Sequence, residues 1–255
     1  MEYADKLQKY LVNHTRLGIP ALIHCEASAG AQFTEADVFP SAIAQASTFD
    51  TEVVGEMTDI IRKQMYYVGF RQALSPVVDI TRDPRWGRIT ETYGEDAALT
   101  SAMASAFVKG IQGDELKEGV LATAKHFAGH GITEGGLNMG RNIVSERDMR
   151  EIHCKPFQCA ITEAGLKSVM NSYCSVNGEP VVGSKKMLTD ILRGEMGFQG
   201  FVVSDYLSLD RLVDPFAVAE NFEEAGIRAI QAGLDVEYPR SKGFSYKMKE
   251  SIESG

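Results

Sequence analysis

The sequence has no long hydrophobic run and no recognisable export signal. No stretch of about 18 apolar residues, the length that spans a bilayer, occurs in the chain. Residues 1–6 lack the basic-then-apolar order of a secretory signal. These absences disfavour a membrane partner and predict a cytoplasmic location.

Positive charge and paired cysteines are also scarce. Lys and Arg number 26 against 35 Asp and Glu, giving a formal net charge of −9. Binding to nucleic acid or anionic lipid needs clustered basic residues, so we expect neither partner. The four cysteines lack Cys-x-x-Cys spacing, which predicts inert thiols rather than a disulfide framework or a metal site. We expect no cofactor, and a neutral ligand or a small solute is the favoured binding partner.

No internal repeat or low-complexity linker divides the chain, so we interpret residues 1–255 as one domain. Apolar runs alternate with helical-period segments, the pattern of parallel strands joined by crossover helices. The predicted strands are 21–25, 73–80, 121–127, 168–173, 201–205 and 234–237. A (β/α)8 TIM-type barrel needs about eight strands. The six predicted strands therefore indicate an α/β barrel in which either some elements are not recognisable from the pattern or the barrel is incomplete and belongs to a longer protein.

Capping residues punctuate the predicted helices. One predicted helix begins at Thr51 with Asp50 as its cap, and one over 97–108 has Asp96 as its cap and ends at Gly110. A third, over 149–160, follows the cap Ser145, and Pro156 inside it is either a kink or a first-turn residue of a second helical piece. A fourth, over 185–193, ends at Gly194 or Gly197.

The run Phe201-Val202-Val203-Ser204-Asp205-Tyr206 changes abruptly from apolar to polar. A buried barrel strand has this pattern where its carboxyl end delivers side chains to a site. The Asp205 carboxylate suits nucleophilic attack or proton transfer there. The alternative is that Asp205 only caps the next helix.

Lys125 and His126 end another apolar run, before the glycine-rich residues 128–131. Neighbours on an ideal strand point to opposite faces, so both side chains reach one pocket only if the backbone turns. Lys125 suits hydrogen bonds to hydroxyl groups or a Schiff base, whereas a buried histidine is more often a core residue.

Further candidates lie near other predicted strand ends, namely Glu26, Arg88, Met170 and Tyr173. Arg88 either belongs to a solvated ion-pair network within 81–96 or reaches into the pocket. An aromatic ring beside carboxylates suits sugar recognition, because rings stack on CH faces while acids bind vicinal hydroxyls.

Several motifs fall in order between about Ile19 and Glu237, at 76–79, 83–88, 93–96, 125–127, 145–147, 170–173 and 200–206. Together they resemble glycoside hydrolase family 3. The resemblance implies a barrel and a retaining mechanism with a covalent glycosyl intermediate on Asp205.

The resemblance also implies a sugar-binding set. Its positions are Glu26, Arg88, Lys125, His126 and Tyr173, with Met170 lining the same subsite. Tyr206 stands where many members carry Trp, a difference also found in xylosidase-like members. Leu137 stands roughly where others place a sugar-contacting Arg.

Two parts that the resemblance implies are not recognisable in the sequence. Multidomain members take their acid/base Glu from a carboxy-terminal α/β sandwich, and the family's first barrel strand is also missing. We therefore expect a barrel fragment whose partner is that domain, and a poor hydrolase on its own. Glu91, Glu95 and Glu134 are the only loop acids that could substitute.

The predicted function is that of a retaining, exo-acting β-xylosidase or β-glucosidase that releases the terminal sugar of short β-linked saccharides. A β-N-acetylglucosaminidase of the same family is an alternative, since that branch has a similar Lys-His-Phe-x-Gly-His-Gly stretch. Residues 132–138 lack the Asp-Ser-His of that branch. A non-catalytic sugar-binding barrel and a Schiff-base barrel using Lys125 are two competing interpretations of the same residues.

Overall fold

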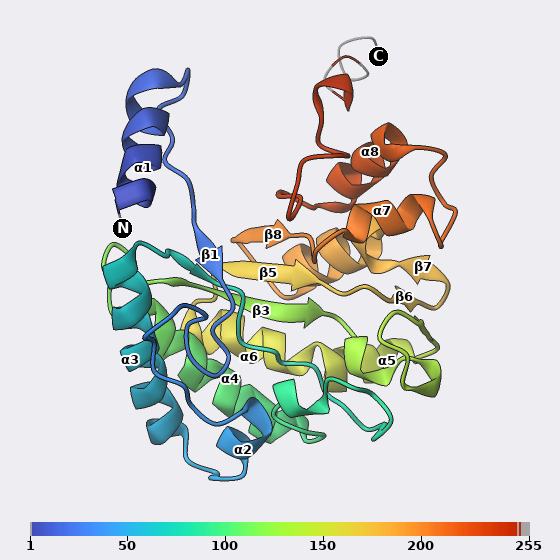
Figure 1. The fold of residues 1–255 in the computed structure, drawn as a ribbon. Coiled ribbons are helices and arrows are strands. Elements are labelled where there is room, and N and C mark those ends of the chain that lie inside the picture. The colour runs from blue at the N-terminus through green and yellow to red at the C-terminus, as the bar shows by residue number, and fades with distance from the viewer. Residues whose placement is uncertain (1, 249, 251–255) are drawn as a thin grey trace.

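The computed structural model describes residues 2–248 and 250. The two ends of the expected domain, residues 1 and 251–255, lie outside the described residues. A parallel sheet forms the centre of the fold, in the order β1-β2-β3-β5-β8 (Figure 1). Its strands are β1 (His24–Cys25), β2 (Gln72–Ala73), β3 (Leu121–Phe127), β5 (Ser168–Asn171) and β8 (Phe201–Val203).

Each strand of this sheet pairs with the next one along the chain, and a parallel bridge from Val203 to Val236 adds a sixth position. The predicted α/β fold with a parallel sheet is therefore confirmed. Among the described residues, no backbone pairing joins β1 to the Val236 segment. These two edges meet instead through rings, since His24 stacks on Tyr238 with centroids 4.5 Å apart.

The strands are shorter than predicted, most clearly in the second one. Ladder pairing covers Gln72–Ala73 and resumes as a bridge between Val77 and Lys125. Pro76 interrupts the run because its nitrogen has no hydrogen to donate. Its carbonyl still accepts from the Lys125 amide at 3.0 Å, so the segment continues beside β3 as far as the site.

Helices cover the outer face of the sheet. The α-helices are α1 (Glu2–His14), α2 (Ala42–Ala46), α3 (Thr51–Val68), α4 (Ala97–Gln112), α5 (Glu146–Asp148), α6 (Lys155–Ala164), α7 (Ser208–Val213) and α8 (Phe222–Ala232). Figure 1 shows α3, α4 and α6 packed side by side, whereas α1 stands apart from α7 and α8. Most buried apolar side chains form one core, which includes residues of these helices and of the strands.

The predicted caps of α3 and α4 are present. The Asp50 carboxylate accepts from the Glu52 and Val53 amides, and the Asp96 carboxylate accepts from the Leu99 amide. The prediction that Gly110 ends the second helix is wrong, because α4 continues to Gln112. A Cβ at Gly110 would lie 2.5 Å from the Gly55 carbonyl oxygen, so this glycine permits close packing of α3 on α4.

Two other predicted helices differ in detail. The Ser145 hydroxyl accepts from the Asp148 amide as expected, but the helix then passes through a π-helical turn, Met149–His153, before α6. Pro156 lies in the first turn of α6, where its missing amide hydrogen costs nothing. The predicted helix 185–193 is the π-helical segment Lys186–Glu195, which includes Gly194.

A small second sheet flanks the strand ends, with the order β4-β6-β7. Its strands are β4 (Arg141–Asn142), β6 (Ser175–Val176) and β7 (Glu179–Pro180). Asn177 and Gly178 join β6 to β7 with φ of 51° and 92°, the positive values that a tight hairpin requires.

Candidate active site

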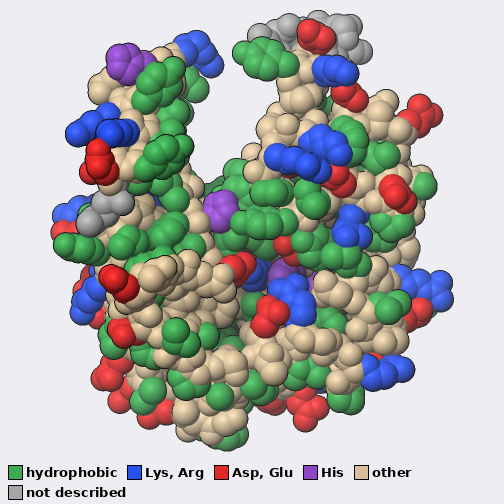
Figure 2. All heavy atoms as spheres, in the orientation of Figure 1, with side chains coloured by type: hydrophobic (Ala, Val, Ile, Leu, Met, Phe, Trp, Pro, Cys, Tyr) green, Lys and Arg blue, Asp and Glu red, His purple; other side chains and the backbone are tan. Residues whose placement is uncertain are grey.

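The carboxyl ends of the parallel strands meet at one edge of the sheet and bring the candidate residues together. Figure 2 shows acidic, basic and histidine side chains gathered near the middle of one face, below a hollow between α1 and α8. The ion pair of Glu26 with Lys125 and the contacts of His126 with Asp79 and Asp205 link four different strand ends.

Asp205 is 8% exposed, and its two carboxylate oxygens differ. Oδ1 accepts from the Tyr206 amide at 2.7 Å. Oδ2 is buried without a hydrogen-bond partner and lies 3.6 Å from Nε2 of His126. The carboxylate does not cap α7, so the helix-capping alternative is wrong. Burial raises the pKa of Asp205, while the nearby charge of Lys125 opposes that shift.

Lys125 and His126 both reach the site although they are neighbours on β3. The pairing of β3 with β5 shifts register between Ala124 and Phe127, and this irregularity re-aims the side chains. Nζ of Lys125 donates to Oε1 of Glu26 at 2.6 Å. The Lys125 side chain is 5% exposed and that of Glu26 is 37% exposed. An amine held in an ion pair is a poor nucleophile, so this geometry disfavours a Schiff base.

His126 is buried between a carboxylate and a guanidinium. Its Nδ1 lies 2.7 Å from Oδ2 of Asp79, which also accepts from the His126 amide at 3.1 Å. Nε2 lies 3.1 Å from a terminal nitrogen of Arg88, which can only donate. We therefore assign the neutral tautomer with hydrogen on Nδ1. Burial holds the pKa of His126 well below its ordinary value, in agreement with a neutral ring.

Arg88 lies inside the cluster rather than in a solvated network. It makes two hydrogen bonds to Glu91, at 3.0 and 2.8 Å, and contacts His126. Another of its nitrogens lies 3.4 Å from Nε2 of His130. The exposed ion pair of Arg85 with Asp83 matches the surface network that was the alternative for this segment.

The aromatic and apolar candidates occupy different depths. The Tyr173 hydroxyl donates to the Tyr206 carbonyl at 2.7 Å, which joins two strand ends at the rim. Tyr206 is 40% exposed, and its hydroxyl lies 2.8 Å from Nε2 of His24. Met170 is 1% exposed and packs with Leu74 and Val203 inside the sheet. The structure therefore places Met170 in an apolar layer.

The remaining loop positions have no described contact with Asp205. The Leu137 side chain is exposed. Glu134 forms an exposed ion pair with Arg141. Among the proposed substitute acids, Glu91 has a described contact with the site, through Arg88.

Asp79 and His130 belong to the cluster although neither was singled out from the sequence. Asp79 follows the apolar residues Pro76-Val77-Val78, and a carboxylate directly after such a run was the sequence signal that could have identified it. In the structure Asp79 is buried. His130 is fully buried, and its Nε2 lies 3.1 Å from the Asn138 amide oxygen. Burial lowers the pKa of His130 to about 3.

Other features of the described residues bear on the sequence predictions. No helix among them is long and apolar enough to cross a membrane. No group of three or more His, Cys, Asp and Glu in this part of the chain could hold a metal ion. The four cysteines are free thiols, as predicted, and burial raises the pKa of Cys25 to about 11.

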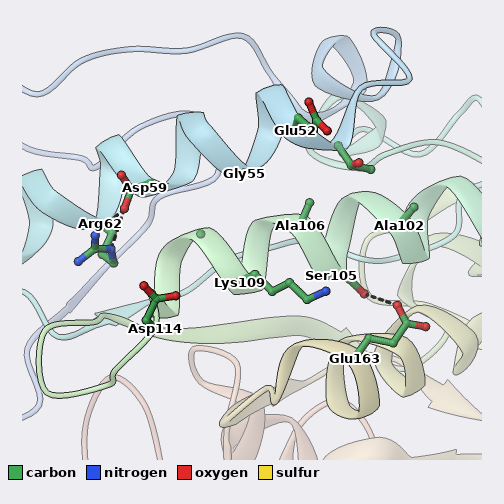
Figure 3. A pocket seen from close by; sticks show the side chains of 13 residues that line it. Glu52, Gly55, Asp59, Arg62, Ala102, Ser105, Ala106, Lys109, Asp114 and Glu163 are labelled. Carbon is green, nitrogen blue, oxygen red and sulfur yellow. Dashed lines mark hydrogen bonds and ion pairs between the residues drawn. The ribbon is translucent and has the colours of Figure 1, made fainter.

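A groove of about 600 Å³ lies on the opposite, helical side of the fold (Figure 3). Side chains of α3, α4 and α6 line it, including Asp59, Lys109 and Glu163. It contains none of the strand-end residues, so the candidate active site is not located there.

Comparison with known proteins identifies the family. The family described as "Glycosyl hydrolase family 3 N terminal domain" matches residues 2–255, and the chain belongs to this family. A β-xylosidase of Formosa agariphila is 39% identical over 232 residues, covering 87% of this chain and 32% of that protein. The resemblance found in the sequence motifs is thus confirmed.

Solved structures of β-glucosidases show the same fold. One from Erythrobacter marinus has a TM-score of 0.94 at 32% identity, covering 99% of this chain and 34% of that one. One from Listeria innocua in complex with glucose has a TM-score of 0.90 at 34% identity, covering 98% and 34%. The chain therefore spans about a third of the length of these relatives.

Proposed function

We propose that this chain is the nucleophile-bearing and sugar-binding part of a retaining, exo-acting β-glycosidase. The observation that carries the proposal is Oδ2 of Asp205, which is buried, accepts no hydrogen bond and faces the neutral His126 ring. Burial raises the pKa of Asp205, and the charges of Lys125 and Arg88 oppose that rise and so favour its ionised form. An ionised oxygen with free lone pairs is what attack on an anomeric carbon needs.

In the proposed reaction, Oδ2 of Asp205 bonds to the anomeric carbon as the bond to the leaving-group oxygen breaks. The leaving oxygen takes a proton from an acid, and water then cleaves the glycosyl ester with net retention. Arg88, Lys125 and Tyr173 interact with Asp205, and Glu26 is paired with Lys125. We propose that these side chains supply donors and an acceptor for sugar hydroxyls.

The proton donor is proposed to come from outside the described residues. Retaining catalysis needs a second carboxyl about 5–5.5 Å from the nucleophile. The other carboxylates of the cluster are already engaged, Glu26 with Lys125, Asp79 with His126 and Glu91 with Arg88. Relatives about three times as long support a donor from a further domain.

The proposed substrates are short β-xylosides or β-glucosides. A relative named as a β-xylosidase and a β-glucosidase solved with glucose support these two sugars. The loop Ile132–Asn138 has no histidine and no Asp-Ser-His, which disfavours the N-acetylglucosaminidase alternative.

A mechanism-based label tests the nucleophile. A 2-deoxy-2-fluoro-β-xylosyl or glucosyl fluoride, followed by peptide mass mapping, should label Asp205 and leave Asp205→Asn unlabelled. Asp214→Asn, at an acid just after α7, is the matched control and should be labelled like the wild type. A label on another residue would refute the assignment. No label, together with saturable binding of xylose or glucose, would favour a non-catalytic sugar-binding barrel.

Comparing substrates with different leaving groups tests the nucleophile and the acid separately. A 2,4-dinitrophenyl glycoside needs no protonation, so the chain should release dinitrophenolate from it. Turnover of xylobiose or cellobiose should be near zero. Rapid hydrolysis of either disaccharide would show that the acid lies within residues 1–255. Glu91 would then be the first residue to replace, because it contacts the site through Arg88.

A further inference from the structure

Arg211 lies at the rim of the Asp205 site, on α7, shortly after the loop that carries Asp205 and Tyr206. Its guanidinium carbon lies 5.1 Å from the centroid of the Tyr173 ring, and the Tyr173 hydroxyl donates to the Tyr206 carbonyl. Arg211 is thus connected to the rim by an aromatic ring.

The Arg211 guanidinium has unused hydrogen-bonding capacity. Within residues 2–248 and 250, no ion pair includes it, and its Nε is buried without a hydrogen-bond partner. The adjacent carboxylate of Asp210 is already held by Lys242 at 2.7 Å and by Arg240 at 3.3 Å. A buried donor without an acceptor is unfavourable, and a bound anion would supply the acceptor that this Nε lacks.

We propose that Arg211 is a specificity-determining residue that binds an anionic group, a carboxylate or a sulfate ester, on the leaving-group part of the substrate. This inference rests on the proposed glycosidase function. The planar guanidinium offers paired donors that match both kinds of oxyanion. Tyr173 supports the guanidinium through its ring without neutralising its charge.

The position of Arg211 assigns the anion to the leaving group rather than to the buried sugar. Of the residues proposed around the sugar, Arg211 has a described contact with Tyr173, through its ring. It has none with Glu26, Arg88, Lys125 or His126, which lie deeper in the set of strand-end contacts. Its link to the site runs through Tyr173 to the backbone of Tyr206, whose side chain is 40% exposed. A group bound there lies at the solvent side of the site.

Matched aryl glycosides test the proposal on the full chain. Nitrophenyl β-xylosides and β-glucosides would carry a ring carboxylate, a ring sulfate ester or a neutral carboxamide. The quantity measured is the ratio of kcat/KM for each anionic substrate to kcat/KM for the neutral one. Charge-assisted hydrogen bonds of the usual strength correspond to about a ten- to hundredfold fall in this ratio in Arg211→Met. Whichever anionic substrate, carboxylate or sulfate ester, shows the larger fall in this ratio identifies the anion that Arg211 prefers.

The controls separate specificity from packing. Arg211→Lys should keep part of the preference, and Arg228→Met, which removes a cation paired with Glu224 on α8, should keep all of it. If Arg211→Met does not fold by circular dichroism, Arg211→Gln replaces it. An equal loss of activity on anionic and neutral substrates would overturn the proposal and show a packing role on Tyr173. No turnover of the neutral substrate by the wild type would instead refute the glycosidase function.

Discussion

Glu26→Gln should destabilise the fold more than Lys125→Met, although the two residues form one ion pair. The Lys125 side chain is 5% exposed and the Glu26 side chain is 37% exposed. Removing Glu26 leaves an ammonium buried without its carboxylate. Removing Lys125 leaves a carboxylate that water already reaches, and Met fills much of the space of the Lys stem.

The magnitudes follow from this asymmetry. Removing one partner of a buried pair costs about 3–5 kcal/mol when the remaining charge stays buried. The expected loss of unfolding free energy for Glu26→Gln is near the lower limit of this range, about 3 kcal/mol, because the amide oxygen still accepts a hydrogen bond from Nζ of Lys125. For Lys125→Met the remaining charge is solvated, so the expected cost is about 0–1 kcal/mol. In a chain of this size, 1 kcal/mol corresponds to about 2–4 °C in Tm.

Urea unfolding of residues 1–255 provides the assay. The only tryptophan, Trp86, is 2% exposed and reports unfolding by fluorescence. Glu151→Gln is the control, because its ion pair with Arg147 has side chains 59% and 80% exposed and should contribute about 0.5 kcal/mol or less. An equal loss of unfolding free energy for Lys125→Met and Glu26→Gln would refute the reasoning. A loss for Glu26→Gln no larger than the loss for the control Glu151→Gln would also refute it.

Two further predictions concern catalysis by the proposed nucleophile, measured on a dinitrophenyl glycoside. Asp79→Asn should lower kcat/KM about tenfold or more, because a neutral amide holds the His126 Nδ1 tautomer less strongly than a carboxylate does; an unchanged value would show that Asp79 is only structural. Lys125→Met should shift the acidic limb of the kcat/KM profile to higher pH. Burial raises the pKa of Asp205, and the charge of Lys125 opposes that shift. Losing Lys125 therefore raises the pKa of Asp205 further, so that the carboxylate becomes protonated at a higher pH. An acidic limb at the same pH as in the wild type would contradict this reasoning.

Local sequence signals located strand ends that carry the site and the starts of α3 and α4, although the strands are shorter than predicted. Apolar runs that stop at Glu26, Lys125 and Asp205 predicted three of the strand ends that meet at the site. Caps such as Asp50 and Ser145 bond to amides two or three residues away, so they can be predicted from the sequence without tertiary structure. Where local signals decide the outcome, the prediction and the structure agree.

Tertiary contacts determine the features that local sequence patterns did not predict. Gly110 is a helix terminator by local rules, but the approach of α3 requires a glycine inside α4. The convergence of Lys125 and His126 depends on a register shift against β5, which no pattern within β3 reveals. The role of Asp79 depends on β3 placing His126 2.7 Å away, across 47 residues of sequence.

The pairing of charges at the strand ends explains why Asp205, rather than another carboxylate of the cluster, suits the nucleophile role. Glu26 and Asp79 each have a carboxylate oxygen within 2.7 Å of a side-chain nitrogen on β3, which ties those oxygens to structural donors. Asp205 faces His126 at 3.6 Å, and His126 is held neutral with its hydrogen directed at Asp79. No hydrogen therefore points from His126 at Oδ2 of Asp205. The same arrangement that fixes the histidine keeps one buried oxygen available for a substrate carbon.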